Sequence, residues 1–207
     1  MVEQSDIPEP VHEQVEEHEE RSRDAGFRRM AAVYLGVVAM LLAISSLGGG
    51  KATKEMLNAN IHASDTYAFA QAKYLRETAY QLAADQLVAQ LTAQPELSDT
   101  AKASLTATIN KYRAAAARYA SDPAGGEGRE QLLERAKIWE AVRDRAERQD
   151  PNFEFAEALF QIAIVLGSVS IVATSRALLG LSAMLAVVAL LLTINGYFLV
   201  ITFPSFA

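Results

Sequence analysis

Three long uncharged stretches, at residues 30–50, 158–175 and 177–207, hold most of the leucine, isoleucine and valine of the chain. Nearly all charged residues lie before or between them. The hydrocarbon core of a bilayer is about 30 Å thick, and a helix needs roughly 20 apolar residues to cross it. The pattern therefore predicts three transmembrane helices, at residues 30–50, 158–175 and 177–203.

The segment 51–94, between the first two apolar stretches, is predicted to be one long helix. It has no proline and no glycine and is rich in alanine and glutamine, which suit a helix interior. Its apolar residues recur at alternating spacings of three and four, which is typical of a helix face packed against another helix. The predicted packing face consists of Ile61, Ala68, Ala72, Leu75, Ala79, Leu82 and Ala89.

Two shorter helices are predicted to follow. Pro95 ends the long helix, and Ser98 or Asp99 is suited to cap the next one. Residues 122–128 have the composition of a loop, and the third helix is predicted to run from about Arg129 until Asp150 and Pro151 interrupt it. The predicted packing faces are Leu105, Ile109, Tyr112, Ala116 and Tyr119 in the second helix, and Leu132, Ala136, Trp139, Val142 and Ala146 in the third.

The lengths of these helices favour an antiparallel arrangement. At about 1.5 Å per residue the first helix rises about 66 Å and each shorter helix about 33 Å. Two short helices packed in succession along the long one bring the chain back to the membrane. We predict an all-α membrane protein with three transmembrane helices and a long antiparallel, coiled-coil-like extramembrane domain at residues 51–157. A compact three-helix bundle is the alternative, and it requires the first helix to bend.

Charge is concentrated before the first apolar stretch. Residues 1–29 contain nine acidic residues and four arginines, together with Pro8 and Pro10, and are predicted to form a disordered or loosely helical acidic tail. This acidic leader does not fit a cleaved signal peptide. The arginines favour a cytoplasmic N-terminus, and Arg176, between the second and third spans, favours the same side. The helical domain and the C-terminus are then periplasmic or extracellular, although a cluster of three arginines precedes the second span.

Composition and motifs argue against several classes of function. The chain has no cysteine, and its Lys and Arg residues are balanced by acids, which disfavours nucleic-acid binding. No phosphate loop, serine nucleophile or zinc signature is present. We interpret His12, His18 and His62 as solvated or satisfied polar residues, and the glycines at 48–50 as a hinge. We predict a non-enzymatic protein with no catalytic residue, no metal site and no cofactor.

Two segments carry a resemblance to a known family. They are residues 58–73 (Asn-Ala-Asn-Ile-His-Ala-Ser-Asp-Thr-Tyr-Ala-Phe-Ala-Gln-Ala-Lys) and residues 155–166 (Phe-Ala-Glu-Ala-Leu-Phe-Gln-Ile-Ala-Ile-Val-Leu). With the spacing of the spans, the chain resembles, over roughly residues 20–205, an uncharacterised bacterial membrane-protein family known only as a domain of unknown function. The resemblance implies a bacterial inner-membrane setting and this architecture, and it implies no activity, cofactor or site residue.

Small residues form stripes along the first two spans, and such stripes allow membrane helices to approach closely. The second span has Ala163, Gly167, Ser170 and Thr174, and we expect it to pack within the protomer, with Gln161 and Asn195 hydrogen-bonding between helices. The stripe of the first span could serve either within a protomer or between protomers. It consists of Ala32, Gly36, Ala39, Ala43 and Ser46.

Aromatic residues on several sides of the long helix, Tyr67, Phe69, Tyr74 and Tyr80, exceed what a two-helix packing can cover. Exposed apolar surface of this kind marks an interface. We predict a self-associating scaffold or interaction module, with membrane lipid and copies of itself as partners, or another membrane protein, and with Tyr67, Tyr74 and Gly36 in the oligomer contact. The alternative is a subunit of an oligomeric channel or a transport accessory. The sequence does not indicate the biological role or the oligomer number.

Overall fold

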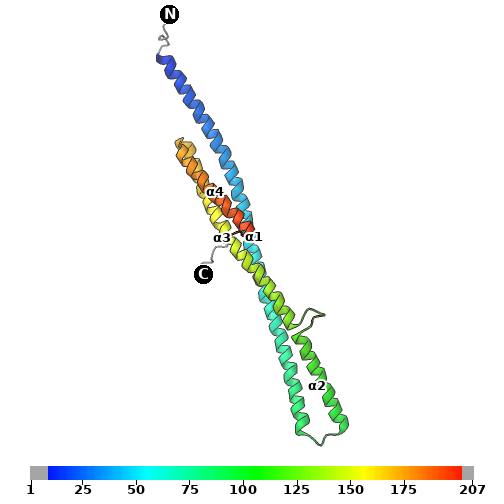
Figure 1. Cartoon of the computed structure of the whole chain (residues 1–207). Coiled ribbons are helices and arrows are strands. Elements are labelled where there is room, and N and C mark those ends of the chain that lie inside the picture. Colours follow the sequence, from blue (N-terminus) through cyan, green and yellow to red (C-terminus); the bar gives the residue numbers. More distant parts are fainter. Residues whose placement is uncertain (1–8, 202–207) are drawn as a thin grey trace. The chain divides into compact units, whose positions relative to one another are not determined.

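The chain is helical in the computed structural model, which describes residues 9–201, with side chains from residue 24 onward (Figure 1). Over this range the helices are α1 (Glu9–Ala93), α2 (Asp99–Ala120), α3 (Arg129–Ala173) and α4 (Arg176–Phe198), and no strand occurs among these residues. The prediction of an all-helical chain is confirmed. Helices α1, α3 and α4 each contain a segment long and apolar enough to cross a membrane.

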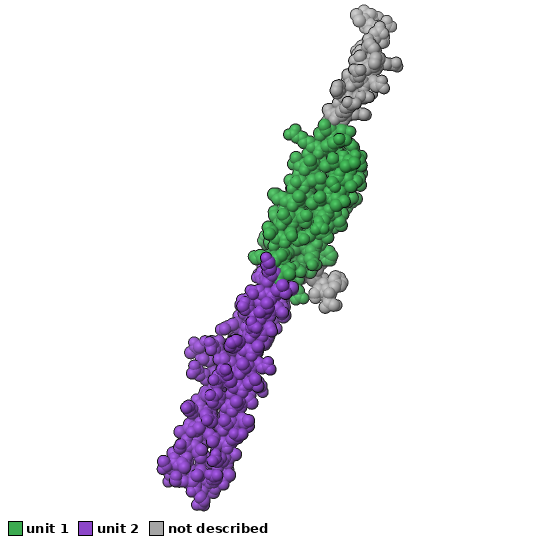
Figure 2. All heavy atoms as spheres, turned by 180° about the vertical axis from the view of Figure 1, so that it is seen from behind, with its two compact units in different colours: residues 1–53, 147–207 green, residues 54–146 purple. Residues whose placement is uncertain are grey.

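The chain divides into two compact units (Figure 2). Unit 1 comprises residues 1–53 and 147–207, and unit 2 comprises residues 54–146. Helices α1 and α3 contribute residues to both units. In the acidic tail, the backbone is helical from Glu9 onward. Residues 1–8 and the side chains of His12 and His18 lie outside the described residues.

The interior of unit 1 is built from small residues of α1, α3 and α4, together with Val38 and Phe160. Hydroxyl groups bond across it: Ser182 of α4 donates to the carbonyl of Ala163 in α3 at 2.6 Å, and its oxygen lies 2.9 Å from the Tyr34 hydroxyl of α1. Thr193 donates to Ser45 at 3.2 Å. Small residues and hydroxyl bonds at helix contacts are typical of helices packed within a membrane, where no hydrophobic effect drives them together.

The ring of Phe153 fills a slot between two glycines in unit 1. A Cβ atom added at Gly48 of α1 would lie 2.5 Å from the Cε1 atom of Phe153, and one added at Gly196 of α4 would lie 2.8 Å from its Cζ atom. Phe153 also meets the Tyr197 ring edge-on at 5.0 Å between centroids. Helix α1 is continuous through the glycines at 48–50, and their role as a hinge stays a prediction. Gly48 provides the space for Phe153.

Gly196→Ala is expected to lower the free energy of unfolding by about 1–3 kcal/mol, because overpacking a buried contact forces neighbours to shift. The ring of Phe153 is only 2 % exposed and has nowhere to move. Gly50→Ala is the control. Nothing lies within 4 Å of a Cβ atom there, so alanine should stabilise the helix by about 0.5–1 kcal/mol. Thermal unfolding of the detergent-solubilised protein measures both, and a stabilising Gly196→Ala would contradict the slot.

Helix α3 continues through Pro151, so the prediction that Asp150 and Pro151 interrupt the third helix is wrong. Proline removes only one backbone donor, and the residues after it hold the helix in place. Asn152 and Phe153 are both 2 % exposed, and the Asn152 side chain donates to the carbonyl of Arg148 at 3.0 Å. The free energy gained by burying this turn exceeds the cost of the backbone hydrogen bond that Pro151 cannot donate.

In unit 2, α2 and then α3 pack along α1. Tyr80 of α1 contacts Tyr112 and Tyr119 of α2, both at 5.6 Å between ring centroids, and His62 of α1 stacks on Trp139 of α3 at 4.6 Å. Ser98 caps α2, as predicted, by accepting a hydrogen bond from the Ala101 amide. The predicted packing faces of α2 and α3 are confirmed, since all their residues are buried or half-buried.

The predicted packing face of α1 is wrong. Ile61, Leu75 and Leu82 are 57 %, 62 % and 58 % exposed, and the alanines between them are exposed as well. The inward positions, which we call the inner seam, alternate at spacings of four and three on the opposite side of the helix. They are Met56, Ala59, Ala63, Thr66, Ala70, Lys73, Glu77, Tyr80, Ala84, Leu87 and Leu91.

Candidate interaction site

The inner seam of α1 contains two charged residues, Lys73 and Glu77, one helical turn apart. Glu77 is 9 % exposed, and its Oε2 atom lies 2.9 Å from Nε of Arg129, the first residue of α3. Its Oε1 atom accepts a weaker bond from Gln81 at 3.4 Å. Lys73 lies 3.5 Å from Glu127, in the loop before α3. Two pairs of opposite polarity fix where the start of α3 meets α1, because sliding the helices would leave buried charges without partners.

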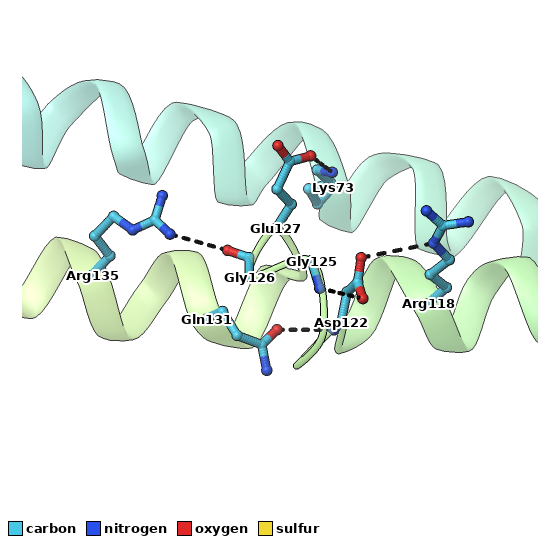
Figure 3. Close-up of polar contacts among 8 residues, drawn as sticks. All are labelled: Lys73, Arg118, Asp122, Gly125, Gly126, Glu127, Gln131 and Arg135. Atoms are coloured by element: carbon cyan, nitrogen blue, oxygen red, sulfur yellow. Dashed lines mark hydrogen bonds and ion pairs between the residues drawn. The ribbon is translucent and has the colours of Figure 1, made fainter.

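The loop between α2 and α3 is held by hydrogen bonds to its own neighbours (Figure 3). The Asp122 side chain accepts from the Gly125 amide at 3.1 Å, and the Asp122 amide donates to Gln131 Oε1 at 3.0 Å. Arg135 donates to the carbonyl of Gly126, whose φ of 66° favours glycine. The loop therefore presents Glu127 to Lys73 in a defined geometry.

Tyr67 and Tyr74, predicted as the oligomer contact, line a shallow groove of about 330 Å³ beside Arg129 and Leu133. Their exposed fractions are 37 % and 52 %. Partial desolvation and a hydrogen bond to Glu140 raise the pKa of Tyr67 above its ordinary value. The guanidinium of Arg129 lies 5.8 Å from the centre of the Tyr74 ring. Both tyrosines thus contact α3 within their own unit and keep part of each ring accessible.

A second apolar face runs along α1 on the side opposite the inner seam, and we call it the outer seam. It is the face that the sequence predicted as the packing face: Ile61, Ala68, Ala72, Leu75, Ala79, Leu82 and Ala89. Its spacings are those of a packed helix face, yet every member is exposed. Helix α1 therefore has two faces with apolar residues at helical spacing in unit 2, and α2 and α3 cover only one.

In unit 1, the predicted small-residue stripe of α3 lies inside, with Ala163 and Ser170 fully buried. A Cβ atom at Gly167 would meet Leu35 of α1 at 2.6 Å, so α1 and α3 approach closely there. The stripe of α1 lies outside: its members are all exposed, and nothing lies within 4 Å of a Cβ atom at Gly36.

The two side-chain amides in the spans lie in different surroundings. Asn195 is buried and donates to Asn152 Oδ1 at 2.7 Å and to the carbonyl of Ile201 at 2.8 Å, and it accepts from the Ile201 amide at 2.8 Å. Gln161 is exposed, so its predicted role in packing within the protomer is not supported. Through these bonds Asn195 links α4 to α3 and holds the backbone at Ile201, just after α4, against its own side chain.

Groups suited to metal binding do not gather in the described part of the chain. It holds no cluster of three or more His, Asp or Glu residues with metal-binding geometry. Each buried side-chain nitrogen or oxygen in this part has a hydrogen-bond partner. The outer seam and the tyrosine groove are apolar or aromatic features of unit 2 that stay exposed.

Sequence reasoning missed Lys73 and Glu77, because a charged residue on a helix is ordinarily taken as solvated. The sequence did contain a signal for their burial. Both residues continue the three-and-four spacing of the buried alanines, and residues of opposite charge, Glu127 and Arg129, lie where the third helix begins.

Comparison with known proteins gave one result. A family model described as "Domain of unknown function (DUF4337)" matches residues 27–199, which is most of the chain. No curated protein and no solved structure matches.

Proposed function

The chain belongs to the DUF4337 family of domains of unknown function, and from this premise we propose that it is a non-enzymatic integral membrane protein that associates with copies of itself through unit 2. The observation that carries the proposal is the uncovered outer seam of α1. Three large aliphatic side chains, Ile61, Leu75 and Leu82, repeat there at heptad spacing and are more than half exposed.

An apolar repeat of this regularity supports a helical partner. Residues at alternating spacings of three and four form a continuous row on a helix, and a second helix with the same repeat can interdigitate with it. Leu75 and Leu82 each have alanines beside them, at positions 72 and 79, which leave room for the side chains of a partner. A second copy provides a matching seam, as the symmetric contact of a homodimer requires.

The first span supports the same proposal. The exposed stripe on α1 in unit 1, which includes Gly36, presents a continuous row of small side chains. Membrane helices associate through such surfaces because close backbone approach gains dispersion contacts that lipid does not provide. The mass of the complex in detergent, after subtraction of bound detergent, tests the proposal. A monomer at concentrations well above the micromolar range would contradict it.

We propose further that the protein lies in a bacterial inner membrane, with a cytoplasmic N-terminus and with unit 2 on the outside. Four arginines before the first span and Arg176 between the second and third spans support this orientation, because basic residues in short loops remain on the cytoplasmic side. The chain has no cysteine, so single cysteines can be introduced without background.

Ser104→Cys is expected to react with a membrane-impermeant thiol reagent in intact cells, and Pro10→Cys is expected to react only after the cells are lysed. Ser104 is exposed on α2 and therefore accessible on the outside. The control is labelling after lysis, which should be equal at the two positions. Labelling of position 10 and not of position 104 in intact cells would reverse the topology.

The alternative function, a subunit of a channel or a transport accessory, stays a prediction. Gln161 lies on the outer surface of unit 1, so it could line a path only between copies. The amide of Asn195 is already bonded within the protomer.

A further inference from the structure

A groove of about 580 Å³ lies in unit 1 between residues 26–30 of α1 and the start of α4. Phe27 and Met30 of α1 and Leu179 of α4 give it apolar walls. Gly180 of α4 also lines it, and no atom lies within 4 Å of a Cβ atom built there. The glycine therefore leaves the groove open, and a side chain at this position would project into the space without a clash.

One end of the groove is basic. Arg176, the first residue of α4, lines it, and no Asp or Glu among the described residues forms an ion pair with Arg176. Arg176 stands between two uncharged stretches, residues 158–175 and 177–207. It therefore marks the level at which the second span ends and the third begins, which is the level of the lipid phosphates if both cross the bilayer.

We propose that this groove binds one anionic phospholipid, whose phosphate pairs with Arg176 and whose acyl region lies against Phe27, Met30 and Leu179. The match is one of charge and position: a guanidinium without an ion-pair partner among the described residues, at the proposed headgroup level, beside an apolar groove. A phosphodiester without a cationic headgroup gains the full attraction of the arginine, whereas choline carries a competing positive charge. The proposal rests on the membrane placement proposed above and is independent of self-association.

The test uses the full chain in lipid nanodiscs, with its one tryptophan replaced by Trp139→Phe and a reporter introduced by Met30→Trp at the rim of the groove. Phosphatidylglycerol or phosphatidylcholine with brominated chains quenches a tryptophan that it contacts. We expect the relative binding constant to favour phosphatidylglycerol about fivefold, which is the effect of one arginine near an anionic lipid surface. Arg176→Gln should reduce this preference to about one, and Arg176→Lys should retain it.

Two further variants distinguish a lipid bound in the groove from general contact with the bilayer. Gly180→Leu fills the groove and should reduce quenching by both lipids, whereas a reporter at Leu191→Trp, exposed within the third span, should be quenched equally by both. Equal binding of the two lipids at position 30, or a preference that survives Arg176→Gln, would overturn the lipid site while leaving the membrane placement intact. Loss of the preference on adding inorganic phosphate would overturn it in favour of a free anion. No quenching at position 191 would refute the membrane placement itself.

Discussion

Leu75→Glu combined with Leu82→Glu is expected to reduce the detergent-solubilised protein from an oligomer to a monomer. Both leucines are exposed in one chain, so glutamate there faces water at little cost. In an assembly through the outer seam, each substitution loses burial worth roughly 1.5–3 kcal/mol and places a charge in a desolvated contact. Helix content in circular dichroism should not change, and sedimentation or light scattering gives the mass.

The matched control is Ala103→Glu with Asn110→Glu on α2. These two positions are exposed, lie in unit 2 and have the same spacing of seven, but no large apolar side chain is lost. Tyr67→Glu with Tyr74→Glu tests the neighbouring tyrosine groove and is also expected to lower the mass, with a smaller effect from Gly36→Leu. An unchanged mass in both the leucine and the tyrosine variants would exclude this part of α1 as the contact.

Arg129→Ala is expected to destabilise unit 2 by about 3 kcal/mol, the lower end of the range for removing one partner of a buried pair. Glu77 is nearly buried and would keep a charge with only the weak bond from Gln81. The side chain of Arg129 is 31 % exposed, and water entering there keeps the loss from being larger. Thermal unfolding of the full chain, followed by its helix signal, measures the change.

Two comparisons define the cause of that loss. Glu127→Ala removes the partner of Lys73, but Glu127 is 73 % exposed, so the cost should be below about 1 kcal/mol. The double variant Glu77→Leu with Arg129→Leu should return close to wild-type stability, because no charge is then left buried alone. A double variant as unstable as Arg129→Ala would show that packing of the arginine stem, and not charge pairing, holds this turn.

Much of the fold follows from sequence because its signals are local. Prolines, glycines and the Ser98 cap set where α2 and α3 begin, and uncharged runs of sufficient length indicate the candidate spans. The faces of α2 and α3 were also predictable, since each has one apolar row, such as Leu132, Ala136 and Ala146.

The inward face of α1 was not predictable in the same way, because α1 has two apolar rows. Pattern alone favours the row without charged residues, which includes Leu75 and Leu82. The structure instead buries the other row, and it accepts Lys73 and Glu77 there because Glu127 and Arg129 neutralise them. That pairing joins residues more than fifty positions apart, which no local rule detects. Pro151 is a similar case, since tertiary burial of Asn152 and Phe153 overrides a local signal to end the helix.

The composition of the inner seam of α1 has a thermodynamic consequence, because four of its eleven residues are alanine and two are charged. Burying alanine sacrifices no rotamer entropy but removes little apolar area from water, so this seam gains less free energy from packing than a seam of large aliphatic side chains would. Under the proposed assembly, burying Leu75 and Leu82 against another copy adds stabilising free energy that a single copy lacks. A partner that binds the folded form alone stabilises it by mass action. Folding and assembly of unit 2 are then one coupled equilibrium, and dilution that separates the copies lowers the free energy of unfolding of each, while its helices stay formed.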